Sequence, residues 1–199
     1  MIVEGRAEFA ALPEIYPALS SEIDCVLLGP AFAPAHPTAP PNVIARACRG
    51  AIKVLEQKRA DHIVVLLDLE DCPSCAGERA QLIERELSQL TGLRVSVVLK
   101  HRAFENWLIA DVEAVRAISG RFVISKAAER KVSPNKADHV DGYAWLSAAS
   151  GRRYEKVDDA RRILSRSSVG RIASNSRSFR RFMRVLDHPA YQLQSARPA

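Results

Sequence analysis

Runs of hydrophobic residues that are too short for helices recur through the first half of the chain. Ile63–Leu67 is a continuous apolar run rich in β-branched residues, and Val95–Leu99 is a similar run interrupted only by Ser96. This pattern is typical of strands buried on both faces of a parallel sheet. Two shorter runs, Ile2–Val3 and Val26–Leu28, predict two further strands.

Segments with helical spacing of apolar residues lie between these runs. They predict a helix over residues 8–19, broken near Pro13 and Pro17, and helices over residues 42–58 and 76–90. The five prolines of residues 30–41 predict an irregular connection. Alternating strands and helices indicate the α/β class, with a Rossmann-like, mostly parallel sheet flanked by helices.

Composition agrees with a globular protein that has a real core. Of the 199 residues, 47% are hydrophobic and 26% are charged, which does not suit a disordered chain. No apolar stretch is long enough to span a membrane, and the N-terminus lacks the basic and apolar regions of a secretion signal. We therefore expect no membrane association and a cytoplasmic location.

Charge divides the chain into two parts. Residues 1–125 hold 13 basic and 16 acidic residues, a net charge of −3, whereas residues 126–199 hold 16 basic and 7 acidic residues, a net charge of +9. We expect an α/β domain at 1–125 and a basic, mainly helical extension at 126–199 that packs on it. A cationic surface suits a polyanion such as nucleic acid, although a basic helix face is often only solvated.

Acidic residues cluster where two of the predicted strands end. Glu4 and Glu8 follow Ile2–Val3, and Asp68, Glu70 and Asp71 follow the run that ends at Leu67. In parallel sheets the carboxyl ends of the strands meet at one edge, where ligands bind. Carboxylates gathered there repel one another unless a cation or a proton intervenes, and Mg²⁺ prefers oxygen ligands. The sequence therefore predicts a metal site.

Two further residues lie near the end of the strand predicted at Val95–Leu99. Lys100 follows that strand directly, and Glu105 opens an apolar helical stretch. Glu105 is expected near the same sheet edge, or else as a helix-start carboxylate that interacts with the helix dipole. Lys100 would neutralise leaving oxygens, or simply be exposed.

Basic residues of the C-terminal part fall on helical segments. Arg177, Arg180 and Arg181 alternate with Phe179 and Phe182, which are expected to face the core. These arginines, together with Lys156, are candidates for gripping a nucleic-acid backbone or docking on an acidic partner protein.

Several of these motifs resemble known families. Glu4-Gly5-x-x-Glu8 followed by Asp68-x-Glu70-Asp71 resembles the Toprim domain of topoisomerases, primases and overcoming-lysogenization-defect (OLD) nucleases. More narrowly, the chain is similar to the Toprim-related family DUF4276. That similarity rests on Leu67-Asp68 through Cys72-Pro73, Phe104-Glu105-Asn106-Trp107-Leu108, Tyr154-Glu155-Lys156 and the segment from Ser176 to Phe182.

The resemblance implies metal-assisted phosphoryl transfer. Glu4, Asp68 and either Glu70 or Asp71 would hold Mg²⁺ or Mn²⁺; Glu70 stands where the Toprim pattern has a second aspartate. Glu8, assisted by Glu105, would complete a second metal site or act as a general base. These roles predict a metal-dependent nuclease that acts on DNA or RNA.

The resemblance also implies a partner, and it leaves two alternative functions open. OLD-type enzymes fuse an ATPase to the Toprim domain, and this sequence has no phosphate-binding loop of that kind. An ATPase in a defence-type system would therefore come from another chain. The alternatives are a non-catalytic partner subunit that keeps the fold, and a receiver-like or phosphohydrolase domain in which Asp68 is phosphorylated and Lys100 supports it.

Overall fold

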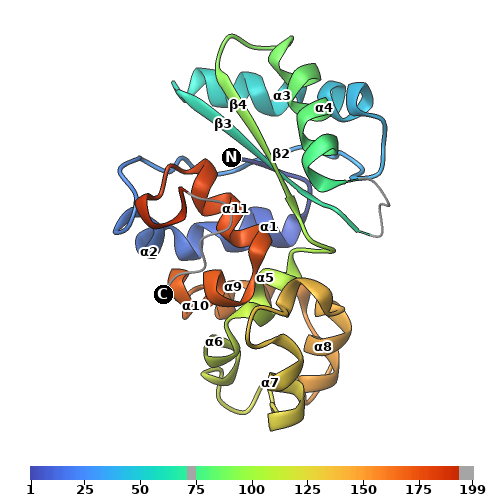
Figure 1. Cartoon of the computed structure of the whole chain (residues 1–199), viewed down its shortest axis with the longest axis vertical. Helices are drawn as coiled ribbons and strands as arrows, with labels where there is room; N and C mark the ends of the chain where they lie inside the picture. Colours follow the sequence, from blue (N-terminus) through green and yellow to red (C-terminus); the bar gives the residue numbers. More distant parts are fainter. Residues whose placement is uncertain (71–74, 193–199) are drawn as a thin grey trace.

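Parallel strands form the centre of the fold. The computed structural model describes residues 1–70 and 75–192, and within them the sheet has the order β2-β1-β3-β4 (Figure 1). Its strands are β1 (Ile2–Val3), β2 (Ala31–Phe32), β3 (His62–Asp68) and β4 (Arg94–Lys100). All three pairings are parallel, which confirms the predicted α/β class.

Helices account for most of the remaining described chain. The α-helices are α1 (Arg6–Ala11), α2 (Tyr16–Ser20), α3 (Pro41–Gln57), α4 (Ala76–Ser88), α5 (Glu105–Ala110), α6 (Val112–Arg116), α7 (Lys126–Val132), α8 (Gly142–Ala149), α9 (Lys156–Leu164), α10 (Val169–Asn175) and α11 (Arg177–Val185). Three short 3₁₀ turns are η1 (Leu12–Ile15), η2 (Ala137–His139) and η3 (Pro189–Tyr191). None of the helices in the described ranges combines the length and apolarity that a bilayer crossing requires.

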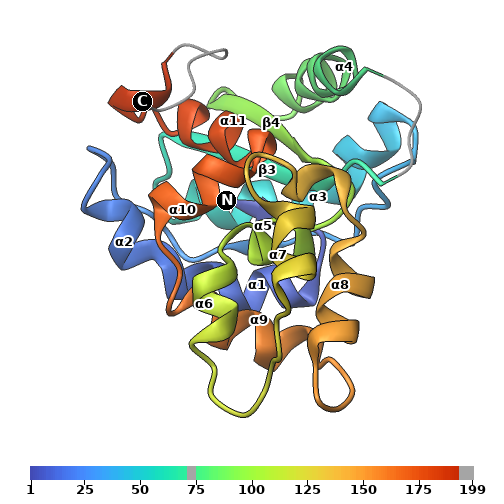
Figure 2. The same ribbon diagram turned by 60° about the horizontal axis from the view of Figure 1, so that its bottom comes forward.

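The two faces of the sheet are covered by different helices (Figures 1 and 2). Ile63, Val65 and Leu67 of β3 point into a core that they share with α3 and α4. Val64 and Leu66 point the other way, into a larger core with α1, α5, α9, α10 and α11. The strict alternation along β3 follows from the two-residue repeat of a strand. Because both faces are buried, the run carries no polar positions.

The larger core joins residues from both sides of position 125. Trp107 of α5 is 1% exposed and contacts the rings of Phe179 and Phe182 in α11, with centroid separations of 5.0 and 5.2 Å. Its indole N–H donates to Ser178 Oγ at 2.9 Å. Phe179 and Phe182 are thus core residues, as predicted. The C-terminal helices pack directly against the elements around the sheet.

Most of the elements predicted from periodicity are present. The segment predicted as a helix over residues 8–19 is indeed interrupted, into α1, η1 and α2, and the predictions for α3, α4, β3 and β4 agree to within a few residues. The strand predicted at Val26–Leu28 is wrong, because that segment is irregular and Val26 is 89% exposed.

The edge strand β2, which pairs with β1, lies instead in the segment predicted to be an irregular connection. The N–H groups of Ala31 and Ala33 donate to the carbonyls of Met1 and Val3 at 2.8 and 2.9 Å. Ala31, Ala33 and Ala35 are buried on the side that faces α3, whereas Phe32 between them is 43% exposed. The buried face of this edge strand is therefore lined by alanine, so no run of large apolar residues marks it in the sequence.

Candidate active site

Glu4 and Glu8 come from the junction between β1 and α1. Glu4 directly follows β1, and Gly5 is the extended residue that precedes α1. The Gly5 N–H donates to Glu8 Oε2 at 3.1 Å, so this carboxylate satisfies one of the N–H groups that a helix start leaves without a partner. A Cβ at residue 5 would lie 3.3 Å from the same oxygen, which makes glycine the fitting residue here.

Asp68 and Lys100 are brought together by the register of β3 and β4. The two residues are direct partners at the carboxyl ends of these strands. β1 lies on the other side of β3, with Val3 opposite Leu66, so Glu4 reaches the end of the same strand. The backbone N–H of Asp68 donates to Glu4 Oε1. Three neighbouring strands therefore end in charged residues at one edge of the sheet.

The Lys100 ammonium lies between three carboxylates. The side chain is fully buried, and its Nζ donates to Glu8 Oε1, lies 3.0 Å from Asp68 Oδ1 and lies 3.8 Å from Glu4 Oε1. We call Glu4, Glu8, Asp68 and Lys100 the carboxylate centre. The expected convergence of Glu4, Glu8 and Asp68 is present, and it is organised around a lysine.

The carboxylate centre contains three carboxyl groups and one ammonium. Burial raises the pKa of Glu4 to about 8; Lys100 opposes this shift, and the neighbouring Asp68 and Glu8 add to it. Burial also raises the pKa of Glu8. For Lys100, burial lowers the pKa, but the three surrounding carboxylates together outweigh it and leave that pKa raised. A lysine that stays charged beside an excess of carboxylates leaves the centre in need of a proton or a further cation.

The donor atoms of this centre suit a divalent cation, although they are not arranged around one. Carboxylate oxygens are the ligands that Mg²⁺ and Mn²⁺ take, and the Asp68 side chain is 23% exposed. Within residues 1–70 and 75–192, no three His, Cys, Asp or Glu side chains are placed to share one ion. Ion binding would therefore need side chains to move around Lys100, or a ligand from outside these ranges.

The other predicted metal ligands lie beyond the end of β3. Glu70 is exposed and has a positive φ of 50°. Its N–H donates to the carbonyl of Arg102 at 2.8 Å, which extends the pairing of β3 and β4 by an isolated antiparallel bridge. The predicted ligand Asp71 lies outside the described residues, so the choice between Glu70 and Asp71 stays open.

Glu105 and Lys156 pair with each other. Glu105 is the first residue of α5 and is 5% exposed, and its Oε1 lies 3.6 Å from Lys156 Nζ. The Lys156 ammonium also lies 4.9 Å from the ring centre of Tyr143. This pair joins α5 to the start of α9, and among the described contacts it is separate from the carboxylate centre. The catalytic role of Glu105 stays a prediction.

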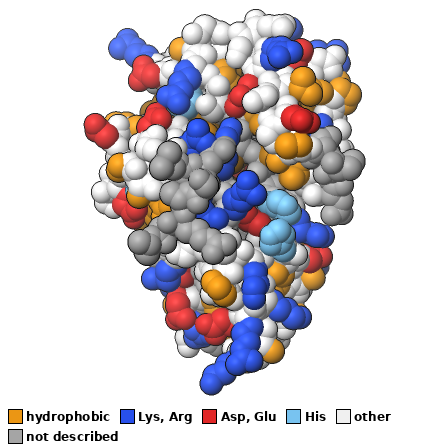
Figure 3. Space-filling view, in the orientation of Figure 1, with side chains coloured by type: hydrophobic (Ala, Val, Ile, Leu, Met, Phe, Trp, Pro, Cys, Tyr) orange, Lys and Arg blue, Asp and Glu red, His pale blue; other side chains and the backbone are white. Residues whose placement is uncertain are grey.

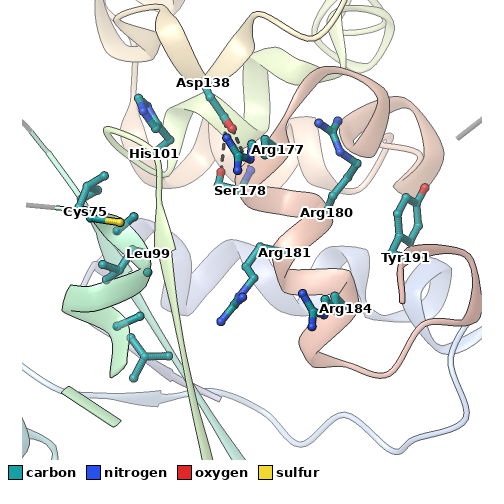
Figure 4. Close-up of a pocket in the computed structure, with 15 residues that line it drawn as sticks. Cys75, Leu99, His101, Asp138, Arg177, Ser178, Arg180, Arg181, Arg184 and Tyr191 are labelled. Atoms are coloured by element: carbon teal, nitrogen blue, oxygen red, sulfur yellow. Dashed lines mark hydrogen bonds between the residues drawn. The ribbon is translucent and has the colours of Figure 1, made fainter. Parts of the chain in front are cut away.

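Arg177, Arg180 and Arg181 line a pocket between α4 and α11 (Figure 4). This pocket has a volume of about 400 Å³ and is separate from the side chains of the carboxylate centre. Arg184, one turn further along α11, lines it as well. The sequence prediction named the arginines but missed the opposite, apolar wall. The helical spacing of the four arginines was the signal for a common face, whereas the wall depends on how α4 packs on β4.

The raised pKa of Glu4 predicts how stability depends on pH without metal. The pKa of Glu4 is near 4.5 in the unfolded chain and about 8 in the folded protein, so between these pH values the folded state keeps a proton that the unfolded state releases. The stabilisation that protonated Glu4 gives to the folded state is therefore complete below pH 4.5 and is lost as the pH rises to 8. We expect Glu4→Gln to remove a slope of at most about 1.4 kcal/mol per pH unit from the free energy of unfolding between pH 5 and 8.

Urea denaturation at several pH values, with EDTA present, measures this slope. Glu78→Gln, at an exposed position near the start of α4, is the matched control and should leave the pH profile as it is. Parallel profiles for wild type and Glu4→Gln would contradict the assigned protonation of Glu4.

Comparison with known proteins identifies a family for the chain. The family described as "Domain of unknown function (DUF4276)" matches residues 3–187, a range that contains both the carboxylate centre and α11. The search of curated proteins and the search of solved structures returned no match. On this match over nearly all of its length, the chain belongs to the DUF4276 family.

Proposed function

We propose that this protein is a metal-dependent phosphodiesterase that cleaves nucleic acid. The observation that carries the proposal is the carboxylate centre: Glu4 and Asp68 from neighbouring strand ends and Glu8 from the first turn of α1 converge on one ammonium, which cannot by itself balance three ionised carboxylates. Such a centre lies at the carboxyl edge of a parallel sheet, where α/β proteins bind ligands. The likeness of its motifs to Toprim domains supports the same chemistry and is part of the proposal.

Mg²⁺ or Mn²⁺ would be held by Glu4 and Asp68 together with Glu70 or Asp71. When bound, such an ion lowers the pKa of water and stabilises charge on a phosphoryl oxygen. Glu4 would give up the proton that its raised pKa retains at neutral pH, and would thereby free an oxygen for the ion. Metal affinity would consequently rise with pH up to about 8.

Lys100 and Glu8 would act as positioning residues. Lys100 is buried and contacts Glu8 and Asp68, so it fixes the orientation of both carboxylates. Glu8 in turn is fixed by the N–H of Gly5. This arrangement leaves Asp68, the more exposed of these carboxylates, as the group nearest to substrate. In place of the general-base role considered for Glu8, we therefore propose that Glu8 acts through Lys100.

The partners proposed from the sequence fit the same function. Arginines on α11 and the net positive charge of residues 126–199 would attract a polyanion. An ATPase on a separate chain would supply recognition in a defence-type system.

One observation favours a second candidate function. The 3.0 Å contact between Lys100 Nζ and Asp68 Oδ1 is also what a phosphorylated aspartate of a receiver-like or phosphohydrolase domain would need for support. Lys100 as a built-in cation would likewise suit a non-catalytic partner subunit. Trapping of beryllofluoride on Asp68 would favour the receiver-like or phosphohydrolase domain.

A cleavage assay tests the proposal directly. Labelled single-stranded DNA, single-stranded RNA and plasmid DNA are incubated with the full-length protein in Mn²⁺ or Mg²⁺, with and without the separate ATPase once that partner is identified. We expect cleavage of at least one substrate that EDTA abolishes. Cleavage that persists in EDTA would refute the metal-dependent mechanism, and saturable Mn²⁺ binding without any cleavage would favour the non-catalytic alternative.

A further inference from the structure

The pocket between α4 and α11 lies along the free edge of β4. In the described sheet β4 pairs with β3 alone, so its other edge faces the space between the two helices (Figure 4). The volume of about 400 Å³ falls within the range of small-ligand sites, ~300–1,000 Å³. Its main lining residues are Leu69, Ala80, Val97, Leu99, His101 and the four arginines of α11.

The wall formed by α11 is cationic for a structural reason. Arg177, Arg180, Arg181 and Arg184 follow the spacing that places residues on one face of a helix. The opposite face buries Phe179, Phe182 and Met183 in the larger core and so fixes the arginine face toward the pocket. Figure 3 shows basic side chains gathered over this part of the surface, with histidine side chains beside them.

The helix that carries these arginines is held firmly. The two oxygens of Asp138 accept from Ser176 Oγ at 2.7 Å and from the N–H of Ser178 at 2.8 Å, which ties η2 to the start of α11. Arg180 Nη2 donates to Asn135 Oδ1 at 2.9 Å. A guanidinium has five N–H donors, so an arginine with a partner inside the protein still has donors for a phosphate.

Charge in the pocket favours an anion. Among residues 1–70 and 75–192, four arginines and one carboxylate, that of Asp138, line the pocket, and this carboxylate accepts hydrogen bonds from Ser176 and Ser178. The guanidinium group is also the side chain best suited to bind phosphate through two parallel hydrogen bonds. The cationic wall is therefore built into the fold.

The facing wall is apolar. Leu69 directly after β3, Val97 and Leu99 of β4, and Ala80 of α4 present hydrocarbon to the pocket. A ligand that satisfies both walls needs a phosphate on one side and a flat or apolar body on the other, which is the composition of a nucleotide. A duplex keeps its bases stacked inside the helix, so only an unpaired base can enter a pocket of this size.

The pocket and the carboxylate centre lie at the same end of β3 and β4. Leu69 and Leu99 are chain neighbours of Asp68 and Lys100, and consecutive Cα atoms are ~3.8 Å apart. Alternation along the strands turns the leucines toward α4 and Lys100 toward α1. We propose that the pocket holds one unpaired nucleotide of a single-stranded nucleic acid, with its base on the apolar wall and its phosphate on the arginines of α11.

This proposal deepens the proposed function by naming single strands as the substrate class, and it is tested by binding without metal. Fluorescence anisotropy of a labelled single-stranded oligonucleotide is measured in EDTA with the full-length protein. We expect Arg181→Gln/Arg184→Gln to weaken binding about tenfold and to reduce its salt dependence. The matched control Arg46→Gln/Arg49→Gln removes the same charge from the exposed face of α3 and should weaken binding much less.

A second variant fills the pocket and keeps every arginine. Gly77 lines the pocket from the exposed side of α4, and a Cβ at this residue would have only Cys75 Sγ within 4 Å, at 3.9 Å. Gly77→Tyr should therefore fold and should weaken binding about tenfold while the salt dependence stays the same. Equal effects of the α3 and α11 double variants, or an unchanged affinity of Gly77→Tyr, would overturn the proposal.

Competition experiments show which kind of ligand the pocket prefers. Unlabelled single strands should displace the probe at much lower concentration than duplex DNA, a free nucleoside monophosphate or an acidic peptide of equal charge. Equal competition by any of these three would overturn the assignment to single strands. Binding that behaves as expected without any metal-dependent cleavage would refute the proposed function and leave the pocket assignment standing. Metal-dependent cleavage without this binding pattern would support the proposed function and refute the pocket assignment.

Discussion

Replacing Lys100 by methionine is expected to lower the free energy of unfolding by about 3–5 kcal/mol. The substitution keeps much of the side-chain volume but removes the ammonium that contacts Glu8, Asp68 and Glu4. Because Glu8 is 2% exposed, its carboxylate would be left buried without its cation. Urea denaturation at pH 7 measures the loss.

Two further variants show whether the loss comes from unpaired charge. Adding Glu8→Gln to Lys100→Met removes one of the buried carboxylates and should recover part of the stability. Lys53→Met, at an exposed position of α3, should change it by less than about 0.5 kcal/mol. If Lys100→Met is as stable as Lys53→Met, the lysine does not organise the centre.

Asp68→Asn should reduce metal-dependent cleavage on the order of 10³-fold. The amide has nearly the same shape as the carboxylate but carries no charge for a cation, and Asp68 is the partly exposed member of the carboxylate centre. We expect the fold to survive, since the buried ammonium of Lys100 keeps its hydrogen bond to Glu8. Initial rates of oligonucleotide cleavage at saturating Mn²⁺ measure the effect.

The matched control for this variant is Asp61→Asn. Asp61 is exposed and precedes the other end of the same strand, β3, so its substitution tests the loss of a carboxylate away from the centre. Its cleavage rate should equal that of wild type. Wild-type rates for Asp68→Asn, with the fold intact by circular dichroism, would show that Asp68 has no part in the reaction.

Local patterns in the sequence were sufficient to predict the central strands and the long helices. β3 is continuous in apolar residues because both of its faces are buried, and α3 and α4 bury one face each. The convergence of Glu4, Glu8 and Asp68 followed from the rule that parallel strands end at one edge. Burial of Phe179 and Phe182 followed from helical spacing.

Other features depend on packing and could not be predicted in this way. The strand that pairs with β1 at the sheet edge, β2, buries alanines beneath α3. A search for runs of large apolar residues therefore placed this strand wrongly, at Val26–Leu28. Residue patterns also provide no measure of the register that sets Lys100 opposite Asp68. For that reason a metal was expected among the carboxylates and Lys100 was considered only as support for leaving oxygens or for Asp68, whereas its ammonium lies at the middle of the centre.

Anomalous-difference density from a crystal soaked in Mn²⁺ would test the central claim most directly. A divalent cation is expected to bind where Glu4 and Asp68 meet, so we predict a manganese peak in contact with both carboxylates in the wild type and no such peak in Asp68→Asn. A fully soaked wild-type crystal that shows Lys100 as the sole cation among the three carboxylates would contradict the account.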